Sequence, residues 1–123
     1  MTPTPPPPFR VLLVEDETLV AMAVEDALSM HGVEVVGPAD SVPLALELVE
    51  RGGFDGALLD VNLRGERVDQ VADALAARGL PFIFTTGTGA DGVPEGHRHR
   101  PVLTKPFRDA EMSAAIDEHL RPA

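Results

Sequence analysis

The chain of 123 residues has the length of one domain, which excludes two full domains. Ten basic against twenty acidic residues give a net charge of −10, and this charge repels nucleic-acid phosphates and anionic membrane surfaces. We therefore expect neither nucleic acid nor membrane as a direct partner. The absence of cysteine excludes a disulfide framework, a thiolate metal site and a catalytic thiol.

The beginning of the chain differs from the rest in composition. Residues 1–8 contain five prolines, which favour an extended polyproline segment, either a spacer or a ligand for a proline-binding domain. We exclude this segment and place the domain at residues 9–121. Neither a secretory signal nor a run of about 18 apolar residues is present, so we expect a cytoplasmic protein.

After this segment, short apolar runs alternate with amphipathic stretches. The first run ends in acids, and Thr18 is a candidate cap for a helix that ends near Gly32. Ser41 is a candidate cap for a second helix, which stops at the glycine pair 52–53. A third helix is expected over about residues 66–78, and Asp109 is the candidate cap of the last. The predicted strands are residues 10–14, 33–37, 56–60, 81–85 and 101–104.

Five strands that alternate with helices predict an α/β fold, a doubly wound parallel sheet with helices on both faces. The fourth crossover, between Gly87 and Pro101, contains three further glycines and a proline. We expect a shortened fourth helix there, of one or two turns. In open sheets of this kind, ligands bind at the carboxyl ends of the strands.

The residues at those carboxyl ends are polar. Glu15, Asp16 and Glu17 follow the first strand, and Asp60 ends the third. Acids after a strand are often only solvated loop residues, but the apolar run before Asp60 places that carboxylate at the end of a buried strand. Grouped carboxylates need a compensating cation, and the first half of the chain carries eleven acids against two bases. Oxygen ligands of this kind favour Mg²⁺.

One cation completes the pattern. Lys105 is the only lysine, since the other nine cationic residues are arginines, and it follows the last predicted strand. A single lysine can arise by chance, but this position beside the acids suits a partner for a carboxylate or a phosphoryl oxygen. Together with the hydroxyl of Thr86, these groups describe a phosphoryl-transfer site with an aspartate nucleophile.

Four short segments resemble the signatures of the bacterial response-regulator receiver domain, in the same order and spacing. They are Val14-Glu15-Asp16-Glu17, Leu58-Leu59-Asp60-Val61-Asn62, Phe84-Thr85-Thr86-Gly87 and Leu103-Thr104-Lys105-Pro106-Phe107. The resemblance covers about residues 9–120. It implies the flavodoxin-like, CheY-like fold, with five parallel strands in the order 2-1-3-4-5.

The resemblance also implies roles for particular residues. Asp60 is similar to the phosphoaccepting aspartate, and Glu15 and Asp16 to the acidic pair that holds Mg²⁺ together with Asp60 and the backbone carbonyl of Asn62. Thr86 matches the hydroxyl that bonds the phosphoryl group, Lys105 matches its ion-pair partner, and the Lys105–Pro106 bond matches a cis peptide. A histidine kinase or histidine phosphotransferase is then the implied donor, and a further protein is the downstream partner. The implied role is signalling and not enzymatic.

Two departures from the family pattern matter. The acidic pair is Glu-Asp where Asp-Asp is common, and Val102 stands where many receivers carry an aromatic switch residue. Phe84 to Gly87, the short crossover and the missing aromatic resemble the FATGUY-type stand-alone receivers, which are named for a Phe-Ala-Thr-Gly motif. Thr85 replaces the alanine of that motif, and its later tyrosine is missing. Because no aromatic switch residue is present, we expect phosphorylation to reorder the segment from Gly87 to Arg100.

Three functional alternatives stay open. The chain is a single-domain receiver that signals by contact or acts as a phosphate sink, or it is the receiver module of a larger hybrid sensory kinase. The third is an aspartyl-phosphate hydrolase of the haloacid dehalogenase type, which would need a second aspartate where this chain has Asn62. We expect the histidines to lie in solvated positions. Two belong to the tract His97-Arg-His-Arg100, and His31 and His119 lie near helix ends.

Overall fold

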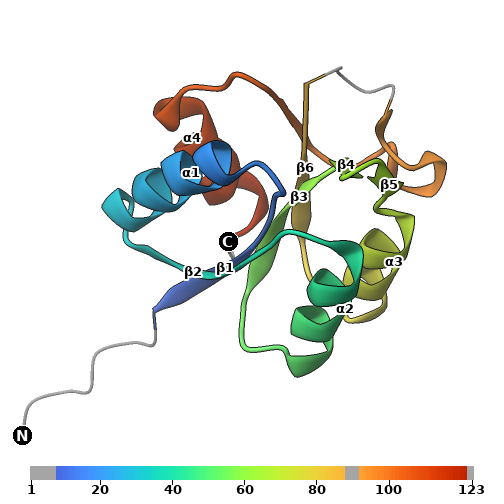
Figure 1. Ribbon diagram of the computed structural model, residues 1–123. Helices are drawn as coiled ribbons and strands as arrows, with labels where there is room; N and C mark the ends of the chain where they lie inside the picture. Colours follow the sequence, from blue (N-terminus) through green and yellow to red (C-terminus); the bar gives the residue numbers. More distant parts are fainter. Residues whose placement is uncertain (1–7, 88–91, 122–123) are drawn as a thin grey trace, which may run out of the picture.

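The computed structural model describes residues 8–87 and 92–121 (Figure 1). Residues 1–7 of the proline-rich segment and residues 88–91 of the fourth crossover lie outside these ranges, and the domain boundary at residue 9 stays a prediction. In chain order, the elements of the main sheet and its helices are β1 (Phe9–Val14), α1 (Thr18–Met30), β2 (Val33–Ala39), α2 (Val42–Arg51), β3 (Gly56–Asp60), α3 (Asp69–Ala77), β6 (Phe82–Thr86), β7 (Val102–Thr104) and α4 (Asp109–His119).

The main sheet has five parallel strands in the order β2-β1-β3-β6-β7. This confirms the predicted doubly wound fold, because the order is the predicted 2-1-3-4-5 when only these strands are counted. Helices α1 and α4 cover one face of the sheet, and α2 and α3 cover the other (Figure 1). No helix in the described ranges combines the length and the apolar character that crossing a bilayer requires.

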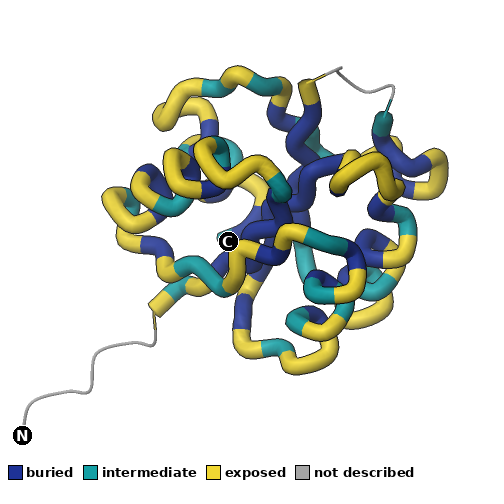
Figure 2. Tube along the Cα trace, viewed as in Figure 1, coloured by how far each residue is buried: buried dark blue, intermediate teal, exposed yellow. Residues whose placement is uncertain are grey.

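The central strands are buried on both faces, as their near-continuous apolar sequences predict. Every residue of β3 and β6 is buried, and Figure 2 shows these strands as the dark core of the molecule. Side chains that alternate along a strand enter two separate cores. Along β6, for example, Phe82 and Phe84 join the core under α2 and α3, whereas Ile83 joins the core under α1 and α4.

The helix starts differ in part from the prediction. Ser41 caps α2 as expected, since its hydroxyl accepts a hydrogen bond from the N–H of Leu44 at 3.3 Å. Thr18 and Asp109 were wrong as caps, because each is the first residue of its helix. At the start of α4 the Glu111 carboxylate accepts from the N–H of Arg108, so the N3 side chain satisfies the backbone donor of the N-cap residue.

The third helix begins three residues later than predicted. Residues Asn62–Leu63 (β4) and Glu66–Arg67 (β5) form a small antiparallel hairpin between β3 and α3. Arg64 and Gly65 make its turn with φ angles of 52° and 83°. The apolar periodicity of residues 66–78 predicts a helix, but the left-handed turn draws the first residues of that range into the hairpin.

The fourth crossover is short, as predicted. Between residues 92 and 100 the structure contains a 3₁₀ helix, η2 (Glu95–His97). The prediction of a solvated loop was wrong for His97, which is 7% exposed and packs beneath the crossover. His31 does lie at the surface, where it pairs with Asp117 at 3.2 Å.

Candidate functional site

The predicted site residues meet at the carboxyl ends of the strands. Asp60 is the last residue of β3, Thr86 is the last residue of β6, and Lys105 follows β7. Glu15 and Asp16 follow β1, directly beside β3 in the sheet. Parallel strands end at the same edge, so residues up to 90 positions apart in sequence become neighbours there.

Lys105 connects the two buried carboxylates. Its Nζ donates to Oε1 of Glu15 at 2.6 Å and to Oδ2 of Asp60 at 2.8 Å. Glu15 is 3% exposed and Asp60 is 6% exposed, so both charges are largely removed from water. Burial alone would lower the pKa of Lys105, but its hydrogen bonds to the two carboxylates raise the pKa above 10.5. The peptide bond from Lys105 to Pro106 is cis, as the resemblance implied.

The acidic residues outnumber this single cation. Carboxylate oxygens of Glu15, Asp16 and Asp60 all lie within 4.8 Å of one another. Burial raises the pKa of Glu15 from 4.5 to about 7, although the hydrogen bond from Lys105 opposes the shift. Three carboxylates with one ammonium leave negative charge that a divalent cation would neutralise, and all the donor atoms are hard oxygens. These residues therefore fit a magnesium ion.

The β4–β5 hairpin holds the acidic residues from the other side. The N–H of Asn62 donates to Oδ1 of Asp60 at 3.1 Å, and the Asn62 side chain accepts from the N–H of Gly65 at 2.9 Å. The N–H of Arg64 donates to Oδ2 of Asp16 at 2.9 Å. Its guanidinium binds the Asp40 carboxylate at 3.0 Å.

Arg64 is the site residue that sequence reasoning missed. Its contribution is a backbone N–H in a left-handed turn, and no side-chain motif reports such a contact. The signal that could have located it is the following Gly65, since an X-Gly pair between short extended segments is typical of a hairpin turn. The hairpin thereby fixes the position of Asp16 relative to Asp60.

A cleft of about 340 Å³ opens beside these groups. Its lining includes Asp60, Thr86 and Lys105 together with residues of the hairpin turn. Thr86 is fully buried, and its carbonyl accepts from the N–H of Lys105 at 2.7 Å, which ties the ends of β6 and β7 together. The cleft thus brings a carboxylate, a hydroxyl-bearing residue and an ammonium group to one small space.

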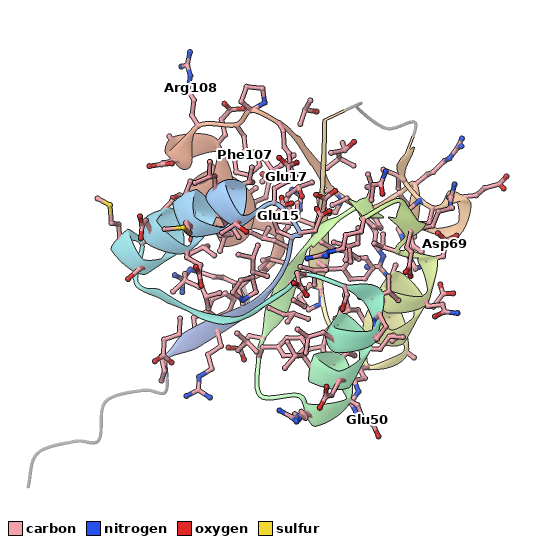
Figure 3. All side chains as sticks on the ribbon, in the orientation of Figure 1. Glu15, Glu17, Glu50, Asp69, Phe107 and Arg108 are labelled. Carbon is pink, nitrogen blue, oxygen red and sulfur yellow. The ribbon has the colours of Figure 1, made fainter. Side chains whose placement is uncertain are left out.

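A second, more apolar groove of about 590 Å³ lies next to the site, between α1 and α4. Glu17, Leu19 and Phe107 line it together with Lys105. Figure 3 shows Glu17 and Phe107 near Glu15, at the end of the sheet where the site lies. Leu19 is 80% exposed at the edge of this groove.

The comparisons with known proteins agree with this geometry. The family described as the response regulator receiver domain matches residues 11–117. The chain belongs to this family. Receiver domains are modules of two-component signalling, so the predicted family and fold are both confirmed.

Particular relatives extend the comparison. The transcriptional regulatory protein PdtaR of Mycobacterium tuberculosis is 31% identical over 114 residues, which are 89% of this chain and 56% of PdtaR. This receiver chain therefore spans about half the length of the curated relatives that it matches. The solution structure of SdrG from Sphingomonas melonis Fr1 is 49% identical, with a TM-score of 0.80, and the match covers 89% of this chain and 93% of SdrG.

Two further solved structures resemble the receiver chain. The BeF3-activated conformation of SdrG has a TM-score of 0.75 at 49% identity and covers 88% of this chain and 92% of that one. The receiver domain of the sensor histidine kinase PA1611 from Pseudomonas aeruginosa was solved with a magnesium ion in its active-site cleft. It has a TM-score of 0.77 at 23% identity, with 93% of this chain and 98% of that one covered, and this likeness shows the fold.

Proposed function

We propose that this receiver domain accepts a phosphoryl group on Asp60 from a histidine kinase or histidine phosphotransferase and then signals by protein contact. The observation that carries the proposal is the environment of Asp60. Its carboxylate ends a central strand beside the cleft, 2.8 Å from the Lys105 ammonium and next to two further acids. Such a group can act as a nucleophile while neighbouring charges stabilise the transferred phosphoryl group.

The transfer forms one bond and breaks another. A carboxylate oxygen of Asp60 attacks the phosphorus, and the bond from phosphorus to the donor's imidazole nitrogen breaks, with its electron pair returning to that nitrogen. Lys105 turns from Oδ2 of Asp60 to a phosphoryl oxygen and keeps its bond to Glu15. The Thr86 hydroxyl donates to another phosphoryl oxygen, and both contacts neutralise charge on the transferred group.

Mg²⁺, held by Glu15, Asp16, Asp60 and the Asn62 carbonyl, would supply further charge neutralisation for the phosphoryl oxygens. The clustered carboxylates support this role, because without a cation they would repel an anionic donor. The Asn62 side chain is already held by the Gly65 N–H, so we assign it no role as a general acid. We therefore do not favour the hydrolase alternative.

The test of the proposed phosphorylation is intact-mass spectrometry after incubation with acetyl phosphate and Mg²⁺. We expect one phosphoryl adduct on the wild-type chain and none on Asp60→Ala or with a chelator present. Asp73→Ala is a matched control, because it removes an aspartate outside the site. An adduct of unchanged yield on Asp60→Ala would contradict the proposal. The chain has no tryptophan, so fluorescence quenching cannot replace the mass measurement.

The role of Lys105 is tested by a substitution that keeps its charge. We expect Lys105→Arg to be defective in phosphorylation or in partner binding, because a planar guanidinium is larger and cannot place one compact charge between two carboxylates 2.6 and 2.8 Å away. Arg78→Lys, away from the site, serves as the control for the exchange itself. Normal phosphorylation and normal partner binding by Lys105→Arg would refute this role.

The chain's place in its pathway is a separate question. A phosphate sink, or a receiver module within a larger sensory kinase, would use the same chemistry at Asp60. Affinity capture with and without beryllofluoride distinguishes signalling by contact from a phosphate sink. Only a receiver that signals by contact gains a partner when the phosphoryl mimic is bound. Equal capture in both states would favour the sink.

A further inference from the structure

A second cluster of polar groups lies outside the site, where the crossover packs against α3 and β6. It consists of His97, Asp73 of α3, Arg100, and the rings of Phe82 and Phe84 on β6; we refer to it as the His97 cluster. Nε2 of His97 lies 2.8 Å from Oδ1 of Asp73, and Nε of Arg100 donates to Nδ1 of His97 at 3.1 Å. The guanidinium of Arg100 also stacks over the Phe82 ring, 4.1 Å from its centroid.

These hydrogen bonds determine the form of the imidazole ring. Arginine can only donate, so Nδ1 of His97 must be the acceptor and carries no proton. Nε2 then carries the ring proton and donates it to the Asp73 carboxylate. Only this neutral tautomer makes both hydrogen bonds. A movement that separates the ring from Asp73 or from Arg100 therefore breaks one of them.

The His97 ring packs on the strand that ends at the site. Its centroid lies 5.7 Å from that of Phe82 and 6.3 Å from that of Phe84. Thr86 is two residues beyond Phe84 on the same strand, so the two side chains point to the same face of the sheet. Both are completely buried, and a closely packed interior transmits the movement of one side chain to its neighbours.

We propose that His97 is the positioning residue that couples the state of Asp60 to the surface of α3 and the crossover. This rests on the proposed phosphorylation of Asp60. A phosphoryl group there draws the Thr86 hydroxyl toward the cleft, and the end of β6 moves with it. The His97 ring follows Phe84, and its hydrogen bonds to Asp73 and Arg100 rearrange.

The alternative carrier on this face is Val102, which pairs with Phe84 across β6 and β7. Valine has one short, branched side chain with few available rotamers, so Val102 offers no large group that could rotate between the core and the surface. His97 reaches from the buried face of β6 to Asp73, whose side chain is 74% exposed. The imidazole therefore joins the buried strand to a charged surface group that a partner can contact.

The experiment is NMR spectroscopy of the ¹⁵N-labelled full chain, with and without beryllofluoride and Mg²⁺. In the free protein we expect the ring nitrogens of His97 to show the Nε2–H tautomer. On addition of beryllofluoride, their chemical shifts and the amide shifts of α3 should change. The amides of Asp60 and Val61 report separately whether the phosphoryl mimic has bound.

Two variants test whether His97 carries the change. His97→Phe keeps a ring on Phe82 and Phe84 but loses both hydrogen bonds, and Asp73→Ala removes only the exposed partner. In each variant, we expect beryllofluoride to change the amide chemical shift of Asp60 as in the wild type. The chemical-shift changes of the α3 amides should fall by at least half. Asp73→Ala keeps the test informative if His97→Phe does not fold. Val102→Ala and Asp117→Ala, which remove the alternative carrier and the partner of His31, should leave the α3 response intact.

The outcomes separate the two proposals. If the wild-type Asp60 amide does not respond to beryllofluoride, the proposed phosphorylation fails and the coupling fails with it. If Asp60 responds but the His97 nitrogens do not, only the coupling is overturned. An undiminished α3 response in both His97→Phe and Asp73→Ala, or its loss in Val102→Ala, would likewise overturn the role of His97.

Discussion

Two polar clusters of this receiver domain, each built around buried side chains, differ in their balance of charge. The site cluster, consisting of Glu15, Asp16, Asp60 and Lys105, sets three carboxylates against one ammonium. In the His97 cluster, one carboxylate and one guanidinium flank a neutral ring, so the charges cancel. Among the described residues that are not exposed, no buried side-chain nitrogen or oxygen lacks a hydrogen-bond partner, so the difference lies in charge and not in hydrogen bonding.

This difference has a general physical meaning. A buried group with surplus negative charge lowers the stability of the fold, and it persists where a bound cation supplies the missing positive charge. A balanced cluster stabilises the fold that contains it. Removing an acid from the site cluster and removing a member of the His97 cluster should therefore have opposite effects on stability.

The largest effect is expected in the His97 cluster. His97→Ala should lower the free energy of unfolding by about 2–4 kcal/mol, because it leaves a cavity beneath the crossover and removes two hydrogen bonds. Urea denaturation measures this loss. His99→Ala, at an exposed position two residues away, should change stability by less than about 0.5 kcal/mol. Equal losses in the two variants would show that His97 is not part of a stabilising cluster.

In the metal-free protein, substitution of Glu15 is expected to raise the free energy of unfolding. Its pKa is about 7 in the fold against 4.5 for the ordinary group, so the unfolded chain releases this proton first and stability falls between pH 4.5 and about 7. Glu15→Gln should remove this loss. With a chelator present, the variant should be more stable than wild type by about 3 kcal/mol above pH 7, with the difference vanishing below pH 4.5.

Urea denaturation at several pH values checks the Glu15 prediction. Glu25→Gln, at a half-buried acid on α1 outside the cluster, is the control. A stability difference for Glu15→Gln that is independent of pH, or that has the opposite sign, would contradict the assignment of surplus charge to the site cluster.

Magnesium should reduce the stability difference between the Glu15 variant and the wild type. At about ten times its dissociation constant, Mg²⁺ should stabilise the wild-type chain by about 1.4 kcal/mol, because the ion binds only the folded site. Glu15→Gln should gain clearly less, whereas Asp73→Ala should gain as much as wild type because it leaves the site cluster unchanged. Thermal melts across a magnesium titration measure this. Equal gains in wild type and Glu15→Gln would exclude Glu15 as a ligand.

The smallest effect is expected for the other histidine–aspartate pair. His31 and Asp117 lie 3.2 Å apart, but the His31 side chain is 31% exposed where that of His97 is 9% exposed. We expect His31→Ala to cost less than about 1 kcal/mol in urea denaturation, because water competes for an exposed pair. A loss as large as that of His97→Ala would show that burial does not explain the difference between the two pairs.

The sequence alone predicted the sheet and most of the residues that lie together at its carboxyl edge. Short apolar runs predicted β3 and β6 to within one residue, since strands buried on both faces need continuous apolar sequence. Polar residues at the ends of the strands, such as Asp60 of β3 and Lys105 after β7, lie together because parallel strands end at one edge. The spacing of residues in the sequence is therefore enough to predict which side chains share an edge, because the parallel sheet places every strand end there.

The tertiary structure decided what depends on contacts between distant segments. The turn at Arg64 and Gly65 replaced the predicted start of α3, and it supplies a backbone N–H to Asp16, 48 residues away. The burial of His97 depends on Asp73, 24 residues earlier, and on the two rings of β6. A histidine in a His-Arg-His-Arg tract has the same local sequence in a solvated loop and in a core, so only the packing of these distant partners distinguishes the two.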